Sequence, residues 1–481
     1  MKQIFTLLSI ACLLQAAVVF AAKQPNIIYI NADDLGVMDV GYNSDRYITP
    51  NIDRLAEQGM RFTEAYAPAA NCAPSRACVF SGQFSTRHGV YTVNNSDRGD
   101  AEHRRIIPTE NTLYLTDEQF TLAEALKSAG YATIHLGKWH LGEDATTQGF
   151  DVNIAGNTHG GPTGGYFTPF TSGSMTGYND KYPAGTHRVD ILSDEAIAFM
   201  REHKDEPMFI HMAWFSIHTR LEPVPGLVEK YKEGNHANPT YASMIEKMDE
   251  GIGRILDELD QLGLAKNTLV VFCSDNGGIA AQSSQAPYRA GKGSYFEGGV
   301  RVPLVARWPG TIKAGSECKT PVTGLDFYPT FVDVAKVSLP KGKVLDGDNL
   351  MPLLRNKGTF PERTLFWHFP IYLQRYNGVA DESHDPLFRT RPGTIMLQGE
   401  WKLHQYFEDG RIELYNLASD IGEKKNLAKK LPEKANEMHR QMLDWRKQMN
   451  APVPTKPNPK FDAKEEAKAI RQQKQKAKNN S

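Results

Sequence analysis

The sequence predicts an α/β protein: a large mixed, mainly parallel sheet flanked by helices, followed by a smaller antiparallel sheet with one helix. Short apolar runs at 26–31, 208–215 and 268–272 are typical of buried strands. Helical patterns separate these runs, and the longest is the amphipathic stretch 241–262. Because strands that alternate with helices usually pair in parallel, we expect the first part to be an open α/β sheet.

The pattern changes after about residue 358, where short strand-like segments follow one another. These segments are 365–369, 394–397, 401–406 and 413–416. Glu408-Asp409-Gly410-Arg411 is typical of a hairpin turn, and 431–449 has the pattern of a closing helix. We therefore expect a main domain over residues 23–358, a small subdomain over 359–450 and a mobile or loosely helical Pro- and Lys-rich tail over 451–481.

The first residues have the features of an export signal. Lys2 is followed by a largely apolar run over 4–20, and the small residues Ala21 and Ala22 precede a polar stretch. This pattern predicts a signal peptide over 1–22 and an exported protein, periplasmic or extracellular. A membrane anchor is one alternative, although the apolar run is at the short end for crossing a bilayer. A lipoprotein modified at Cys12 is another.

Charge and cysteine content argue against two further classes of protein. The 481 residues include 55 Lys and Arg against 56 Asp and Glu, a balance that disfavours nucleic acid as a partner. Five cysteines are too few for a disulfide-built scaffold of this length. We expect Cys78 to pack in the core, and a disulfide from it to Cys273 or Cys318 remains open.

Acidic and amide side chains follow two of the predicted strands. Asp33 and Asp34 come after the first strand, and Asp275 and Asn276 come after the strand at 268–272. Ligands of open α/β sheets bind outside the carboxyl ends of the strands, so the two pairs are expected to converge. Oxygen-bearing side chains suit a hard cation such as calcium or magnesium. Either pair alone could instead be a helix cap or a turn.

A long motif surrounds Cys72. The string Asn71-Cys72-Ala73-Pro74-Ser75-Arg76 gives a Cys-x-Pro-x-Arg spacing before an apolar helix start that ends at Ser81-Gly82. This string resembles the signature of the type I sulfatases, which belong to the alkaline-phosphatase-like superfamily. In that family the cysteine is converted to formylglycine (3-oxoalanine).

Further motifs of the same family occur in order across nearly the whole mature chain. They lie at 23–36, 49–55, 130–142, 274–278, 292–303 and 413–417. Two departures stand out. Gln83 occupies a position that is usually Arg in the family, and Ile217 and Arg220 replace prolines that usually surround the histidine at position 218.

The resemblance implies a role for each matching residue. Four residues and modified residue 72 would ligate one calcium ion: Asp33, Asp34, Asp275 and Asn276. Arg76 and Lys138 would hold the geometry and balance the charge, and His140 would contact the second hydroxyl of the hydrated aldehyde. The sulfate would be bound by Lys138, His218 and Lys292. His218 and Lys292 would also assist the leaving oxygen. His368, at the entry to the small subdomain, either faces the substrate or packs in the core.

These roles predict a sulfuric ester hydrolase that acts on a sulfated saccharide, as an exo- or an endo-enzyme. Its maturation partner would be a formylglycine-generating enzyme or an equivalent factor, and nothing in the sequence indicates an oligomeric state. The loop cations Arg375, Arg389 and Arg391 either contact the sugar or are solvated. The rival functions are a phosphatase or phosphonate monoesterase on the same fold and a non-catalytic protein that binds sulfated glycans. The single set of acids predicts one metal ion, which favours sulfate.

Overall fold

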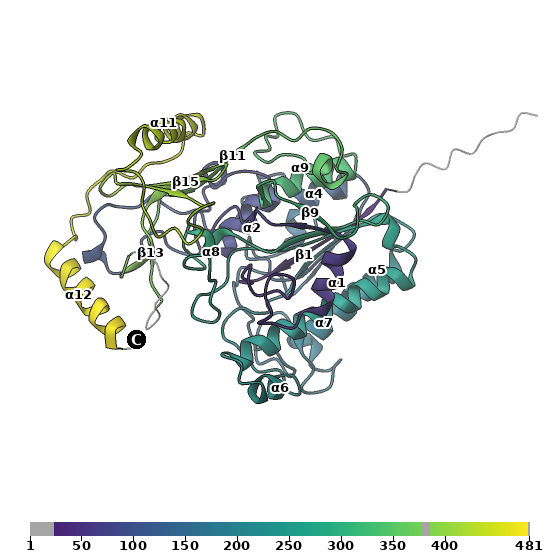
Figure 1. The fold of residues 1–481 in the computed structure, drawn as a ribbon. Helices are drawn as coiled ribbons and strands as arrows, with labels where there is room; N and C mark the ends of the chain where they lie inside the picture. Colours follow the sequence, from purple (N-terminus) through teal and green to yellow (C-terminus); the bar gives the residue numbers. More distant parts are fainter. Residues whose placement is uncertain (1–23, 377–384, 480–481) are drawn as a thin grey trace, which may run out of the picture.

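The computed structural model describes residues 24–376 and 385–479, which form an α/β part and a smaller C-terminal part (Figure 1). The predicted signal peptide over 1–22 lies outside the described residues. Within the described ranges, no helix combines the length and the apolar character needed to cross a membrane.

The α/β part is built on an eight-stranded sheet of order β5-β4-β6-β1-β7-β8-β2-β9. Its strands are β1 Asn26–Ala32, β2 Met60–Phe62, β4 Ala132–Gly137, β5 Val152–Ile154, β6 Met208–Ala213, β7 Thr268–Ser274, β8 Leu304–Arg307 and β9 Ser316–Cys318. Strand β8 is antiparallel to both of its neighbours, whereas the other pairings are parallel. The sheet is therefore mixed and mainly parallel, which confirms the predicted fold class.

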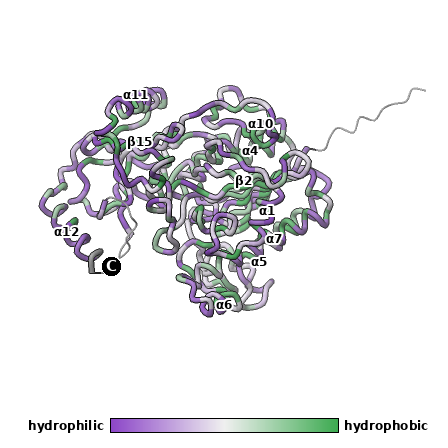
Figure 2. The backbone as a smooth tube through the Cα atoms, in the orientation of Figure 1, coloured by the Kyte–Doolittle hydropathy of each residue, from purple (hydrophilic) through white to green (hydrophobic). Residues whose placement is uncertain are grey.

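Helices cover both faces of this sheet. One face packs against α1 Pro50–Gln58, α5 Arg188–Glu202 and α7 Pro239–Gln261, and the other against α2 Cys72–Ser81, α4 Leu122–Ser128 and α9 Phe327–Val334. Strand β1 serves both cores, because Ile28 and Ile30 face one and Ile27 and Tyr29 face the other. Burial on both sides explains why the strand is an unbroken apolar run, and Figure 2 shows hydrophobic segments concentrated in these central strands.

The C-terminal part contains a four-stranded antiparallel sheet of order β11-β14-β15-β16. Its strands are β11 Thr364–Phe369, β14 Gly393–Gln398, β15 Trp401–Tyr406 and β16 Ile412–Asn416, and α11 Pro432–Gln448 packs on one face. The predicted hairpin turn joins β15 to β16, with Gly410 at a φ of 70°. Shorter elements complete the chain: β3 Ala65–Tyr66, β10 Val322–Thr323, β12 Leu373–Gln374, β13 Phe388–Thr390, α3 Ser85–His88, α6 Val228–Glu233, α8 Glu297–Val300 and α10 Met351–Leu354.

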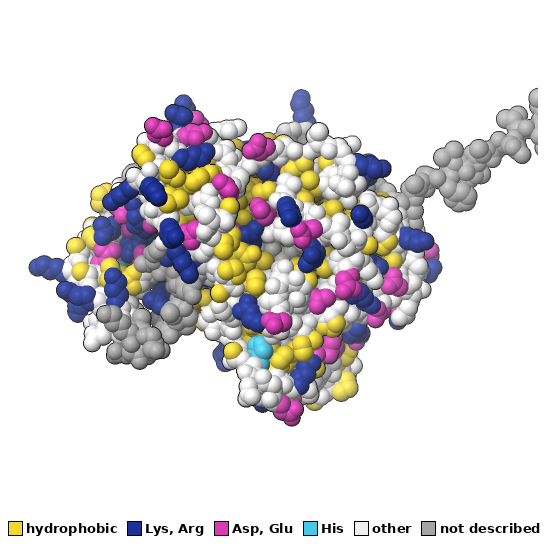
Figure 3. Space-filling view, viewed as in Figure 1, with side chains coloured by type: hydrophobic (Ala, Val, Ile, Leu, Met, Phe, Trp, Pro, Cys, Tyr) yellow, Lys and Arg dark blue, Asp and Glu magenta, His cyan; other side chains and the backbone are white. Residues whose placement is uncertain are grey.

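The segment that was expected to be a mobile or loosely helical tail contains a helix. It forms α12, Ala463–Asn479, which lies beside β13 at the edge of the C-terminal part (Figure 1). Glu466 is buried between Arg105 and Arg391, at 2.9 and 3.1 Å. The composition is that of a solvated segment, and Figure 3 shows Lys and Arg side chains at this edge of the molecule. One acid of this helix contacts two arginines that are distant in the sequence, and composition alone cannot reveal such contacts.

Candidate active site

The predicted convergence of the two acidic pairs occurs at the carboxyl ends of β1 and β7. These strands are paired in parallel through Ala32 and Ser274, so the residues that follow them emerge side by side. Asp34 N–H donates to Asp275 Oδ1 at 3.2 Å, and Asn276 Nδ2 donates to Asp34 Oδ1 at 2.9 Å. Asp33, Asp34, Asp275 and Asn276 are each at most 2% exposed.

Cys72 joins this group from the first turn of α2. Its Sγ and carboxylate oxygens of Asp33 and Asp275 all lie within 4.8 Å of one another. The residue stands at the N-terminus of a ten-residue helix, where the helix dipole favours negative charge. Burial opposes ionisation of the thiol, but the charges of Lys138 and Lys292 overcome this effect and leave the pKa of Cys72 below its usual value. A nucleophile or an anion at this position is therefore electrostatically favoured.

Three cations match the three buried acids. Lys138 Nζ lies 2.8 Å from Asp33, Arg76 lies 2.9 Å from Asp275, and Lys292 lies 2.6 Å from Asp34. Arg76 also donates to the carbonyl of Lys138 at 2.8 Å, so the first two pairs are held as one unit. The formal charges of these six side chains cancel, and the buried pairing avoids the large cost of an isolated internal charge.

Burial and these partners shift the pKa values of two of the acids, Asp33 and Asp34, in opposite directions. Burial raises the pKa of Asp33 to about 6, against the lowering effect of Lys138. Burial also acts on Asp34, but Lys292 and His218 outweigh it and hold the pKa of that carboxyl below its usual range. Two adjacent carboxylates with such different surroundings are typical of a functional site.

His140 reaches the site because glycines make room for its backbone and its ring. It has a φ of 63° and follows Gly137, where a Cβ atom would come within 2.0 Å of the carbonyl oxygen of Ala213. A Cβ on Gly160 would lie 2.6 Å from the imidazole. Burial, followed by the charge of Lys138, holds the pKa of His140 well below its ordinary value, so the ring is neutral at neutral pH.

His218 approaches the same acids from the segment after β6. One of its ring nitrogens lies within 4.8 Å of carboxylate oxygens of Asp33 and Asp34. Its Nδ1 lies 2.6 Å from the carbonyl oxygen of Thr219, which can only accept, so Nδ1 carries the proton and Nε2 is the acceptor. Burial and then Lys138 lower the pKa of His218 to about 4. Tyr166 supports the segment by donating to the carbonyl of His218 at 2.8 Å.

A pocket of about 510 Å³ opens onto this cluster. Cys72, His140, His218 and Lys292 line it, so four of the predicted catalytic residues face one space. Arg76 and Lys138 are almost completely buried behind them, and their contacts are with the acids. The structure therefore divides the predicted set into residues that face the pocket and residues that support them.

The pocket also contains residues that the motifs did not indicate. Arg98 and Tyr376 line it, and Arg389, which the sequence left undecided, lines it as well. Arg389 donates to the carbonyl of Lys292 at 3.1 Å and its guanidinium stacks on the ring of Tyr376. Burial and then the nearby Arg389 lower the pKa of Arg98. Arg98 lies in a loop without periodicity, so no pattern in the sequence could have identified it.

His368 does not belong to this pocket, which corrects the prediction that it binds substrate. It is 4% exposed, with Nδ1 at 2.9 Å from Thr394 Oγ1 and Nε2 at 2.8 Å from the carbonyl oxygen of Pro452. Both ring nitrogens are therefore occupied. Arg391 is likewise neither solvated nor in the pocket, since it is buried against Asp385, Glu408 and Glu466.

The remaining cysteines show no disulfide among the described residues. Cys78, Cys273 and Cys318 are free and buried, as is Cys72. Cys78 Sγ lies 3.5 Å from His88 Nε2, and burial raises its pKa. All three thiols pack in the core, and burial raises the pKa of Cys78 and Cys273, whereas the pKa of Cys72 is lowered.

The fold and the site together define the class of protein. A pocket at the strand ends of an α/β sheet combines an activated side chain, three carboxylates and several cations, which suits a hydrolase of anionic esters. The sulfatase family model matches residues 25–337, and the model of the C-terminal region of N-sulphoglucosamine sulphohydrolase matches 291–448. The chain belongs to the type I sulfatase family of the alkaline-phosphatase-like superfamily and is a sulfuric ester hydrolase.

Individual relatives agree with this assignment. The chain is 33% identical to a sulfatase of Formosa agariphila, with 90% of each chain covered. It is 32% identical to human N-acetylgalactosamine-6-sulfatase, over 72% of this chain and 69% of the relative. Among solved structures, Ps i-CgsB in complex with k-i-k-neocarrahexaose has a TM-score of 0.73 at 28% identity, covering 94% of this chain and 98% of the other.

Proposed function

We propose that this sulfatase removes sulfate from a saccharide, using a formylglycine made from Cys72 beside one calcium ion. The observation that carries the proposal is the position of Cys72. Its side chain lies beside the strand-end acids Asp33 and Asp275, at a helix N-terminus, and it lines a cationic pocket. This surrounding explains why the cysteine of the Cys-x-Pro-x-Arg motif would be the reactive position.

The acids form a suitable site for a hard divalent cation. Three carboxylates and the Asn276 amide supply oxygen ligands, and Asn276 Oδ1 is buried without a hydrogen-bond partner among the described residues. A buried acceptor without a donor is costly unless something binds it. We assign calcium to Asp33, Asp34, Asp275, Asn276 and residue 72, where it would lower the pKa of a hydroxyl and neutralise charge.

The modified side chain at position 72 would supply the nucleophile, a hydroxyl of the hydrated aldehyde. Arg76 and Lys138 fix the acids around it, since each is paired with one carboxylate. Neutral His140 would accept a proton from the second hydroxyl when the aldehyde is restored. Lys292 would hold the sulfate as a cation. His218 would take up a second proton at Nε2 when the anionic sulfate is bound, and in that form it would hold the sulfate and assist the leaving oxygen. Fixed cations stabilise the charge that spreads over the sulfate oxygens in the transition state.

A saccharide is the substrate that best fits the pocket and the relatives. Arg98 and Arg389 extend the positive charge from the reaction centre to the lining of the pocket. The names of two relatives refer to N-acetylgalactosamine 6-sulfate and to a neocarrahexaose. The proposal includes export through the leader at 1–22 and maturation by a formylglycine-generating enzyme or an equivalent factor.

Two measurements test the proposal. The tryptic peptide over 62–76 of native protein should have the mass expected when an aldehyde replaces the Cys72 thiol. The enzyme should hydrolyse 4-nitrophenyl sulfate much faster than 4-nitrophenyl phosphate. The rival is a phosphate or phosphonate esterase, because the fold also resembles a phosphonate monoester hydrolase of Agrobacterium radiobacter with a TM-score of 0.63. An unmodified cysteine in active enzyme, or a preference for phosphate, would refute the proposal.

A further inference from the structure

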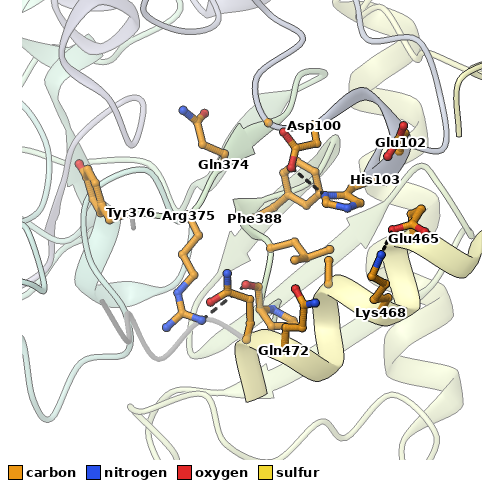
Figure 4. A pocket seen from close by; sticks show the side chains of 15 residues that line it. Asp100, Glu102, His103, Gln374, Arg375, Tyr376, Phe388, Glu465, Lys468 and Gln472 are labelled. Atoms are coloured by element: carbon orange, nitrogen blue, oxygen red, sulfur yellow. Dashed lines mark hydrogen bonds and ion pairs between the residues drawn. The ribbon is translucent and has the colours of Figure 1, made fainter. Parts of the chain in front are cut away.

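A second pocket, of about 470 Å³, adjoins the active-site pocket, and α12 forms one of its walls (Figure 4). Tyr376 lines both pockets. Residues that are consecutive in the sequence also line different pockets. Arg98 lines the first pocket and Gly99 the second, and likewise Arg389 lines the first and Phe388 the second. The two pockets therefore share Tyr376, and their walls are neighbours at residues 98–99 and 388–389.

The helix that forms this wall lies beyond both matched family models, which end at residues 337 and 448. Its position is fixed at Glu466, which is buried between Arg105 and Arg391. Further upstream, the carbonyl of Lys456 accepts from the N–H of Ile107 at 2.8 Å. These contacts hold the first part of α12 against the wall of the pocket.

The lining of the second pocket differs in charge from that of the first. The lining contains three acidic residues and two basic residues. The acids are Asp100, Glu102 and Glu465, and the bases are Arg375 and Lys468. Lys468 is paired with Glu465 at 2.9 Å, and His103 lies 3.5 Å from Asp100. Amides and rings complete the lining, namely Gln374, Gln472, Gln473, Tyr376 and Phe388. Figure 4 shows the side chains of α12, of 100–103, of 374–376 and of Phe388 around one space.

We propose that the second pocket binds an uncharged sugar linked to the sulfated sugar in the active site. This inference rests on the proposed saccharide substrate. Amides and paired charges offer donors and acceptors for hydroxyl groups, and the volume lies in the range of ligand pockets. A second sulfate would meet a lining without net positive charge, whereas the first sulfate meets Lys292, Arg98 and Arg389.

Ala469→Trp tests the proposal because it fills the pocket from α12 without removing a charge. Ala469 lines the pocket, whereas Ala467 is exposed on the same helix and does not, so Ala467→Trp is the matched control. The probes are 4-nitrophenyl sulfate, N-acetylgalactosamine 6-sulfate and neocarra-oligosaccharides whose sugar next to the sulfated galactose lacks or carries its own sulfate. Thermal unfolding of both variants checks that the fold is retained.

We expect Ala469→Trp to raise KM at least about tenfold for oligosaccharides with an uncharged neighbour and to leave 4-nitrophenyl sulfate hydrolysis unchanged. Ala467→Trp should behave as the wild type, and the wild type should prefer the uncharged neighbour. Equal kinetics of the two variants on oligosaccharides, or a wild-type preference for the doubly sulfated form, would overturn this inference alone. If the wild type hydrolyses the aryl sulfate but none of the saccharides, the saccharide proposal falls together with it.

Discussion

Two regions of the molecule bury several charges each, but only one of them has the features of a catalytic site. The first is the strand-end cluster around Cys72. The second, here called the junction cluster, joins the two parts of the chain through Glu297, Lys402, His404 and Glu423. Lys402 lies 2.8 Å from Glu297 and 3.3 Å from Glu423, and His404 also lies 3.3 Å from Glu423. All four residues of the junction cluster are buried.

The two clusters differ in the hydrogen-bonding capacity that remains once their charges are paired, and in whether a pocket reaches them. In the junction cluster, Glu297 also binds Arg301 and Tyr66, and Glu423 also accepts from the N–H of Glu297. None of the pockets described above opens onto it. In the strand-end cluster, Asn276 Oδ1 has no hydrogen-bond partner among the described residues, and the cluster faces a pocket. Buried charge by itself therefore indicates a structural network, and it indicates a site only where ligand capacity and an open space remain.

The largest effect is expected from Cys72→Ala. Loss of the nucleophile should lower the turnover of 4-nitrophenyl sulfate by about 10⁴-fold or more. The melting temperature should change little, because the Cys72 side chain makes no hydrogen bond to another residue in the part of the chain that the structure describes. Cys78→Ala, a buried cysteine on the same helix, is the control and should remain active. Substantial turnover by Cys72→Ala would refute the assigned nucleophile.

Removal of the metal should have the next largest effect. We expect chelator treatment to lower activity on the order of 100-fold because it removes the ion. Separately, Asn276→Ala should lower activity to a similar extent because an oxygen ligand is lost. Asn276→Asp keeps an oxygen at the position and should retain more activity than Asn276→Ala. The check is metal content by elemental analysis alongside kinetics. Activity that is indifferent to chelator, in protein without bound metal, would contradict the metal site.

Lys402→Met in the junction cluster should act on stability instead. Removing the cation leaves two buried carboxylates without their shared partner, which costs about 3–5 kcal/mol of unfolding free energy. Molecules that remain folded should keep kcat for 4-nitrophenyl sulfate within a few-fold of the wild type. Lys424→Met, at an exposed position nearby, should change stability by less than about 0.5 kcal/mol. Denaturant unfolding measures both, and equal stabilities would show that the cluster does not join the two parts.

The smallest effect concerns pH and His368. Burial lowers the pKa of this histidine to about 3, below its ordinary value of 6.5. The unfolded chain therefore takes up the proton first, and stability is lost as pH falls below about 6.5. Between pH 6.5 and 5 one such group accounts for about 2 kcal/mol. The unfolding free energy of His368→Gln should fall less over this range than that of the wild type. Identical slopes would contradict the assignment.

The arrangement of residues could be predicted from the sequence where chemically distinctive side chains follow a recognisable local pattern, such as a strand. Asp33, Asp34, Asp275 and Asn276 follow apolar runs, and parallel pairing brings the ends of such runs together. The motif around Cys72 is contiguous, so its helix and its glycine end could be identified without knowledge of the fold. His368 was misassigned because a histidine between aromatic residues has the same local pattern whether it faces a pocket or the core.

The sequence by itself determined the sheet class, and it predicted that Cys72 and the acids Asp33, Asp34 and Asp275 lie together. Each of these depends on residues close along the chain or on the regular pairing of strands. Only the tertiary structure decided which cations satisfy those acids, that His368 is enclosed and that α12 is fixed. These features depend on contacts such as Arg76 with Asp275 and Arg105 with Glu466, which join residues 199 and 361 positions apart. Such contacts leave no periodic pattern in the sequence, and they contribute to stability only when the chain has packed.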